Sequence, residues 1–123
     1  MKRQIKFRAK TTANGHWVYG SLVVYKDGLC AIVNAKSNPW VDPATVGQFT
    51  GLLDRNGQEV YEGDLIKCSQ SKTIIFEVYY NFEKGAFCFA EHTRDGRFEG
   101  TTAIGDIFSF NRTMDVVGNI HEQ

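Results

Sequence analysis

The sequence predicts an all-β protein. Its 123 residues include nine Phe, five Tyr and two Trp, set among twelve Gly and only two Pro. This composition favours strands joined by tight turns over helices. Several runs alternate apolar and polar residues with a period of two, which is typical of strands that bury one face. Asn-Gly and Asp-Gly pairs separate these runs, and such pairs favour reversals between antiparallel strands.

The N-terminal part of the chain predicts a three-stranded meander. Its first strand, residues 5–10, places apolar side chains on one face and a stripe of three cations on the other, namely Lys6, Arg8 and Lys10. The pairs Asn14-Gly15 and Asp27-Gly28 then introduce two further strands, at 16–25 and 29–33. Unpaired edges in so small a unit would allow a homo-oligomer to form, because exposed backbone groups can add strands.

A polar loop at residues 34–47 follows the meander. Pro39 and Pro43 prevent regular strand pairing there, and Trp40 lies between them as a candidate anchor. A connection of this length indicates either a functional loop or a packed one. We therefore predict two parts packed as one compact protein: an N-terminal β meander with its loop at 1–45, and a larger β part at 46–123.

The larger part is organised around residues 48–67. Asn56-Gly57 after Asp54 predicts a turn in which the aspartate side chain bonds nearby backbone amides, and Glu62-Gly63-Asp64 predicts a second turn after a short strand. Further strands are predicted at 46–53, 65–69, 73–82, 86–92 and 115–120, with turn-like segments at 69–72, 83–85 and 94–97. Residues 100–114 fit either a short strand or a single helical turn.

Charge and cysteine content narrow the classes of function. Fourteen Lys and Arg balance fourteen Asp and Glu, so the whole chain has no net charge to attract a polyanion or a membrane surface. A nucleic-acid site would have to be a local patch. Cys30, Cys68 and Cys88 lie in separate apolar runs, which favours reduced core thiols in a reducing cytosol over a disulfide framework. No run approaches the roughly 18 apolar residues of a membrane span.

Four blocks that together span nearly the whole chain carry a family resemblance. They are Ile5-Lys6-Phe7-Arg8-Ala9 with Trp17-Val18-Tyr19-Gly20; Thr45-Val46-Gly47-Gln48-Phe49-Thr50-Gly51-Leu52; Asp54-Arg55-Asn56-Gly57 with Val60-Tyr61-Glu62-Gly63-Asp64-Leu65-Ile66; and Val116-Val117-Gly118-Asn119-Ile120-His121-Glu122. With these blocks the chain resembles the YopX family of bacteriophage and prophage proteins. The resemblance implies a small N-terminal β unit followed, from Val46 onward, by an SH3-type, partly open barrel. It also implies the cytoplasm of a bacterial host, and it brings no catalytic residue, ligand or cofactor with it.

The excess of aromatic residues, the balanced charge and the lack of a catalytic motif favour a non-enzymatic binding module. Candidate surface aromatics are Trp40, Phe49 and Tyr61; packing is the alternative for each, and the favoured one for Phe49. Turn chemistry leaves Tyr61 and Glu62 without a firm structural role. We therefore predict that a host or phage protein binds at Trp40, Tyr61 and Glu62.

A nucleic-acid-binding module is the alternative function. Its phosphate contacts would come from a set of cations in two parts of the chain: Lys6, Arg8, Lys10, Arg94 and Arg97. An ordinary solvated strand face is the simpler explanation of the stripe at residues 6–10.

A hydrolytic enzyme is the third hypothesis. Its carboxylates would lie among Asp54, Glu59, Glu62 and Asp64, although turn chemistry explains Asp54 and Asp64 without catalysis. The chain has no Cys or His spacing typical of a metal site and no nucleophile motif, so we predict no catalytic residue, no metal and no cofactor.

Overall fold

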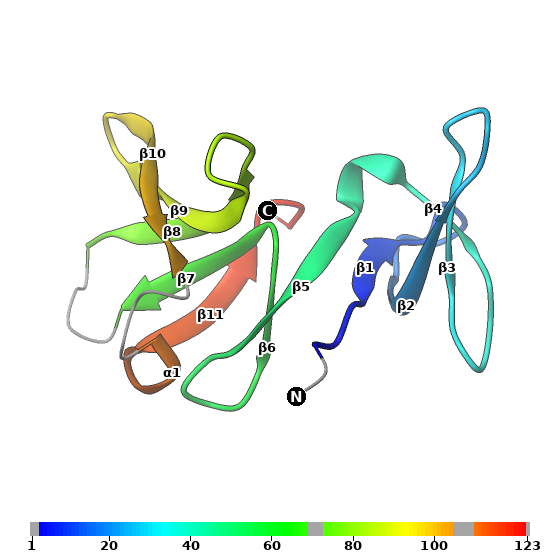
Figure 1. Cartoon of the computed structure of the whole chain (residues 1–123), viewed down its shortest axis with the longest axis horizontal. Coiled ribbons are helices and arrows are strands. Elements are labelled where there is room, and N and C mark those ends of the chain that lie inside the picture. Colours follow the sequence, from blue (N-terminus) through cyan, green and yellow to red (C-terminus); the bar gives the residue numbers. More distant parts are fainter. Residues whose placement is uncertain (1–2, 69–72, 105–109, 123) are drawn as a thin grey trace. The chain divides into compact units, whose positions relative to one another are not determined.

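The computed structural model describes residues 3–68, 73–104 and 110–122. Antiparallel strands dominate it, and the predicted all-β class is confirmed. The strands form two open sheets (Figure 1). The chain divides into two compact units, Met1–Phe49 and Thr50–Gln123, which we call the first and the second unit. The division falls after Phe49, four residues beyond the predicted one.

The first unit contains β1 (Phe7–Lys10), β2 (Trp17–Val24), β3 (Cys30–Val33), β4 (Trp40–Val41) and a 3-10 helix, η1 (Pro43–Thr45). Its strands lie in the order β4-β3-β2-β1, and β1 also pairs with the start of β5 (Gly47–Leu53). Because side chains alternate along each strand, the apolar ones gather on one face. There they form a core centred on Ala9, Cys30, Ile32 and Val41. The three strands of the predicted meander are confirmed to within two residues.

The chain that follows β1 covers the outer edge of β4. Thr11 forms an antiparallel bridge with Val41. The Thr12 N–H donates to the Trp40 carbonyl oxygen at 3.1 Å, and the Asp42 N–H donates to the Lys10 carbonyl oxygen at 2.8 Å. These bonds use backbone groups that an added strand would need. The edge of β4 is therefore covered at these residues.

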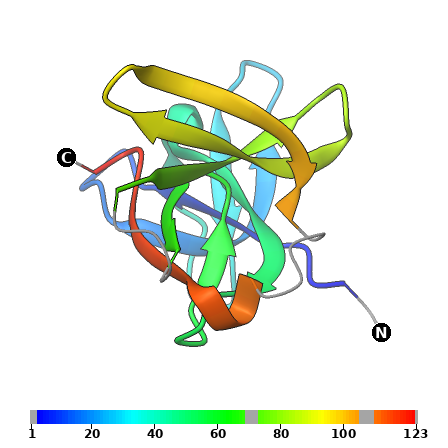
Figure 2. The ribbon, with the colours of Figure 1, turned by 90° about the vertical axis from the view of Figure 1, so that its left-hand side faces the viewer.

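The second unit contains β6 (Glu59–Tyr61), β7 (Asp64–Cys68), β8 (Ile75–Asn81), β9 (Ala86–Thr93), β10 (Gly96–Ala103), a short helix α1 (Phe110–Thr113) and β11 (Met114–Asn119). Five of these strands form a sheet in the order β10-β9-β8-β7-β11, while β5 runs on into this unit and pairs with β6. In Figure 2 the β9–β10 hairpin, yellow to orange, marks one edge of the sheet and β11, red, the other. The core is centred on Val60, Ile66, Val78, Phe89, Ile104 and Met114.

Asp54 organises the turn between β5 and β6, as predicted. Its Oδ1 accepts the N–H groups of Asn56 at 2.8 Å and Gln58 at 2.9 Å, and its Oδ2 accepts the N–H of Val116 at 3.0 Å. In the next turn the Tyr61 N–H donates to Asp64 Oδ2 at 2.7 Å. Asp54 and Asp64 are 3% and 1% exposed, so both of these proposed catalytic carboxylates are buried acceptors of backbone hydrogen bonds.

Three parts of the chain differ from the prediction. β4 lies inside the predicted loop, and β10 occupies residues 96–103, where no complete strand is predicted. Of the alternatives for residues 100–114, the strand ends at Ala103 and a helical turn occupies Phe110–Thr113. The predicted turn at 69–72 lies outside the described residues. None of the described helices has the length and apolar character needed to cross a membrane.

Two of the three cysteines lie in apolar cores. Cys30 and Cys88 are buried, Cys68 packs partly buried against the core of the second unit, and all three are free thiols. The prediction of core thiols is therefore confirmed for Cys30 and Cys88.

Candidate functional site

Trp40 lies on the face of the first unit opposite its core. In the strand ladder Trp40 pairs with Ala31, which pairs with Val23, whereas the core residues Cys30 and Val41 point to the other face. Trp40 is 49% exposed, while Ala31 is only 4% exposed. The predicted surface position of Trp40 is confirmed.

Tyr25 and Leu29 extend this surface at the β2–β3 turn. The ring of Tyr25 packs edge-on against Trp40 with the ring centroids 5.2 Å apart. The Tyr25 N–H donates to the Leu29 carbonyl oxygen at 2.8 Å, and the two residues are 48% and 53% exposed. We call Tyr25, Leu29 and Trp40 the Trp40 patch. The edge-to-face contact orders both rings while leaving each about half exposed, so the patch is a preformed apolar surface.

Tyr61 and Phe49 are not surface aromatics. They are 2% and 7% exposed, respectively. The surface position is therefore wrong for Tyr61, whereas the packing favoured for Phe49 is confirmed. The Tyr61 hydroxyl donates to Glu59 Oε1 at 3.0 Å, and its backbone N–H is bonded to Asp64. Because these polar groups have partners, burying Tyr61 carries little penalty. Glu62 is half-buried in the turn after β6. Its predicted contact with a host or phage protein stays a prediction.

The predicted basic stripe is supported by aromatic rings. Lys6 Nζ lies 5.1 Å from the centroid of Phe49, and Arg8 Cζ and Lys10 Nζ lie 4.6 Å and 5.4 Å from that of Trp17. Arg8 is 6% exposed, and all three cations have further interactions within the molecule. An ordinary solvated strand face therefore does not describe Arg8.

Formal charge is divided unequally between the two units. Residues 1–49 contain seven Lys and Arg against two Asp and Glu, which gives +5, and residues 50–123 contain seven against twelve, which gives −5. The balanced total therefore conceals a basic first unit and an acidic second unit. Each unit can select partners of opposite charge, although the whole chain carries no net charge.

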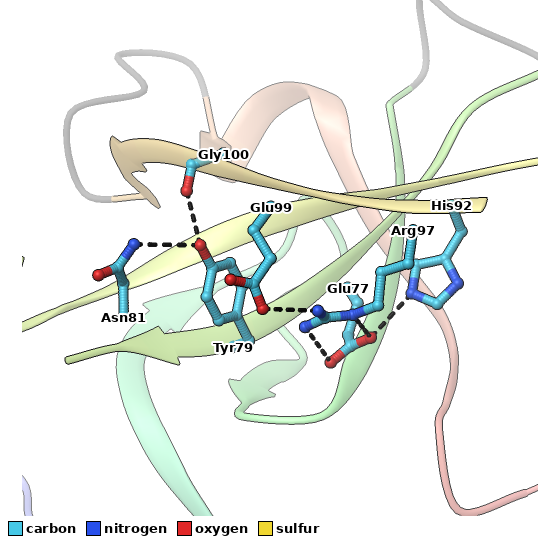
Figure 3. A network of polar contacts seen from close by, with 7 residues as sticks. All are labelled: Glu77, Tyr79, Asn81, His92, Arg97, Glu99 and Gly100. Atoms are coloured by element: carbon cyan, nitrogen blue, oxygen red, sulfur yellow. Dashed lines mark hydrogen bonds and ion pairs between the residues drawn. The ribbon is translucent and has the colours of Figure 1, made fainter. Parts of the chain in front are cut away.

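A polar network covers part of the five-stranded sheet of the second unit (Figure 3). Glu77 of β8 accepts two hydrogen bonds from Arg97 of β10, at 2.9 Å and 3.2 Å, and His92 Nε2 lies 2.8 Å from Glu77 Oε1. Arg97 also donates to Glu99 at 2.6 Å, and its guanidinium carbon lies 5.2 Å from the Tyr79 ring centroid. Two carboxylates thus hold Arg97, which leaves this predicted phosphate-binding cation already neutralised.

Arg94, the other predicted cation of this unit, lies in the turn between β9 and β10 and is exposed. No three His, Cys, Asp or Glu side chains of the described ranges are grouped as a metal ion would require.

Burial and hydrogen bonding act in opposite directions on Glu77. Burial opposes ionisation, but the hydrogen bonds from Arg97 and His92 outweigh it, so the pKa of Glu77 lies below its ordinary value of 4.5. The hydrogen bond to Glu77 in turn raises the pKa of Arg97. Glu77 and Arg97 are therefore ionised together at neutral pH.

We expect the stabilising effect of Glu77 to disappear in acid. Its folded-state pKa is lowered, so ionised Glu77 stabilises the fold above pH 4.5 and loses this effect as the pH falls through the folded-state value. The difference in unfolding free energy between wild type and Glu77→Gln, measured by urea denaturation, should therefore shrink below pH 4.5. Replacing the exposed Glu83 with Gln should have little effect at any pH. A Glu77→Gln difference that is independent of pH would contradict this expectation.

A groove of about 460 Å³ opens beside the network and is lined by residues of β8, the β8–β9 turn and β10. Its lining includes Tyr80, Asn81, Phe82, Glu83, Glu99 and Gly100. The Tyr79 hydroxyl donates to the Gly100 carbonyl oxygen at 2.6 Å, and Asn81 Nδ2 donates to the Tyr79 hydroxyl at 3.1 Å (Figure 3).

A bulge in β10 shapes this groove. The register of β10 against β9 shifts between Glu99 and Ala103, and a bulged segment releases backbone groups from the ladder for other contacts. A Cβ at Gly100 would lie 2.9 Å from the Phe89 carbonyl oxygen, so the close approach of the two strands requires glycine there.

Comparison with models of protein families shows which family this two-unit β protein belongs to. The sequence model described as YopX protein matches residues 6–123. The chain belongs to the YopX family. A search of curated proteins gives no match. Membership of the YopX family confirms the resemblance carried by the four sequence blocks.

Several candidate residues of this YopX-family chain lie outside those blocks. Tyr25 and Leu29 flank an Asp-Gly turn, and the contact of Tyr25 with Trp40 forms only when the hairpin is folded. Glu77 had a detectable signal, because it is the single charged residue in the run Ile75-Phe76-Glu77-Val78. An acid in so apolar a strand needs a buried partner, but the sequence does not identify that partner as Arg97.

Proposed function

We propose that this chain is a non-enzymatic binding module whose first unit binds an acidic protein surface through the Trp40 patch. The observation that carries the proposal is the half-exposed Tyr25–Trp40 pair, with ring centroids 5.2 Å apart. Ordered aromatic side chains lose little conformational entropy on binding, which is why Trp and Tyr are common at the centres of interfaces. The formal charge of +5 on the first unit favours a partner with acidic residues around an apolar centre.

The proposal includes the biological setting that the family resemblance implies. The chain is a phage- or prophage-encoded accessory protein, and its partner is a host or phage protein met in the cytoplasm of a bacterial host. An SH3-type arrangement of the second unit is part of the same proposal. Its support is that β7, β8, β9 and β10 follow one another as antiparallel neighbours, as in a small meander barrel.

Trp40→Ala is expected to weaken partner binding by about tenfold or more, because the change removes the largest side chain of the patch. The partner is recovered by affinity capture from phage-carrying cells, and its binding to purified wild type and variant is then measured by titration calorimetry. Val24→Ala is the matched control, since Val24 is 64% exposed at the same hairpin but outside the Trp40 patch. Equal affinities for Trp40→Ala and Val24→Ala would remove the Trp40 patch from the interface.

A nucleic-acid partner is the second candidate. The observation in its favour is the charge of +5 on the first unit. Captured nucleic acid whose binding weakens steeply with added salt would support this candidate over a protein partner, because phosphate contacts release counterions.

A further inference from the structure

We propose that the groove lined by β8, the β8–β9 turn and β10 binds a cationic side chain, Arg or Lys, from a basic peptide segment. The site goes beyond the proposed function, because it lies in the acidic second unit, whereas the Trp40 patch lies in the basic first unit. Three observations support it: the charge of the groove, its exposed aromatic ring and its hydrogen-bond acceptors.

The groove is negatively charged. Glu83 and Glu99 are both lining residues. Glu99 shares Arg97 with Glu77, so two carboxylates face one guanidinium, and with His92 counted as neutral one negative charge remains. Glu83 adds a second charge, and Lys84 is not a lining residue. The surrounding unit carries a formal charge of −5, so its field favours cations at this surface.

Phe82 supplies an exposed ring at the groove. It is 89% exposed, the largest value among the large apolar side chains that the structure describes. Its position is not random, because Tyr80 packs edge-on against Phe82 with centroids 5.3 Å apart and against Phe87 at 5.4 Å. A cation over such a ring is stabilised by the ring quadrupole. The same chain already uses this contact internally, where Arg97 lies 5.2 Å from the Tyr79 centroid.

The groove offers several hydrogen-bond acceptors. The Gly100 carbonyl oxygen accepts from the Tyr79 hydroxyl and has a second lone pair for a ligand. The two lining carboxylates of Glu83 and Glu99 accept but do not donate when ionised. An anionic ligand would be repelled here, and an apolar ligand would desolvate the carboxylates without replacing their hydrogen bonds. A guanidinium or an ammonium group supplies several donors together with the complementary charge.

The test is a titration of the ¹⁵N-labelled full chain with acetyl-Gly-Arg-Gly-amide at millimolar concentration, followed by amide chemical shifts. Shifts are expected at residues 79–83 and 99–101. The same peptide with citrulline in place of Arg has nearly the same shape without the charge and should cause much smaller shifts. Phe82→Ala and Glu83→Gln should each weaken binding by about two- to fivefold, the range of one exposed cation–π or ionic contact.

Asp95→Asn is the matched control, because it removes one exposed carboxylate from the β9–β10 turn, outside the groove. It should leave the affinity within error of wild type. Equal shifts from the Arg and citrulline peptides would overturn the proposal, as would binding that Phe82→Ala and Glu83→Gln leave unchanged. Trp40→Ala should not alter this titration, so failure here and failure of the proposed function are distinguishable.

Discussion

Replacing Asp54 with alanine is expected to lower the free energy of unfolding by about 3 kcal/mol. The carboxylate is 3% exposed and accepts three backbone N–H groups, those of Asn56, Gln58 and Val116. Hydrogen bonds to a charged acceptor each contribute about 1.5–3 kcal/mol. The expected loss of stability is smaller than the sum of three such hydrogen bonds, because the exposed amides of the turn bind water once the carboxylate is removed. Urea denaturation followed by circular dichroism measures the change.

The ionised state of Asp54 makes this effect dependent on pH. Burial opposes ionisation, but the backbone N–H groups of Val116, Gln58 and Asn56 outweigh it and hold the pKa of Asp54 below its ordinary value of 3.8. The stabilising effect is therefore complete above pH 3.8 and is lost as the pH falls through the folded-state value. Asp95→Ala, an exposed turn carboxylate, should change stability by less than about 0.5 kcal/mol. An Asp54→Ala variant as stable as Asp95→Ala would show that the turn does not depend on this carboxylate.

Local residue chemistry predicts the Asp54 turn, but it does not predict the tertiary contact that Asp54 makes. The Asp54, Asn56 and Gly57 sequence specifies side-chain bonds to amides two and four residues away. The third bond reaches Val116, 62 residues along the chain. It depends on how β11 pairs with β7, which no local pattern encodes.

The burial of individual candidate residues is the property that the sequence predicts least well. Tyr61 follows Val60 in a three-residue strand, and both are buried, so period-two alternation could not identify an outward residue there. The polar ends of Tyr61 and Arg8 made surface positions plausible. The structure instead supplies partners inside the fold, Glu59 for the Tyr61 hydroxyl and the Trp17 ring for Arg8.

The second unit also contains a strand, β10, that its amino-acid composition does not predict. β10 includes Gly96 and Gly100 and shows little alternation, so its own residues have low strand propensity. Pairing with β9 creates this strand, and the pairing also brings Arg97 to Glu77. The acidic groove depends on the same pairing, which is why no sequence pattern located it.

Gly20→Ala is expected to destabilise the first unit by about 3 kcal/mol, at the upper end for an overpacked site. A Cβ at Gly20 would lie 2.4 Å from the Val33 carbonyl oxygen, and backbone atoms cannot rotate away as a side chain can. Moving β3 would also disturb the Asn34 side-chain bond to the Tyr19 carbonyl oxygen, which measures 2.9 Å. The sequence block that ends in Gly20 therefore has a steric reason for its glycine.

Tryptophan fluorescence measures the effect of Gly20→Ala on the first unit alone. Both tryptophans of the chain, Trp17 and Trp40, lie in the first unit, so the urea midpoint of tryptophan emission reports the unfolding of that unit. Gly20→Ala should lower this midpoint markedly. Gly118→Ala is the control, because its Cβ would meet no atom closer than Leu65 Cδ1 at 4.0 Å. An unchanged midpoint for Gly20→Ala would contradict this expectation. It would mean that β3 can shift without loss of stability and that the close approach of Gly20 to Val33 does not affect the free energy of unfolding.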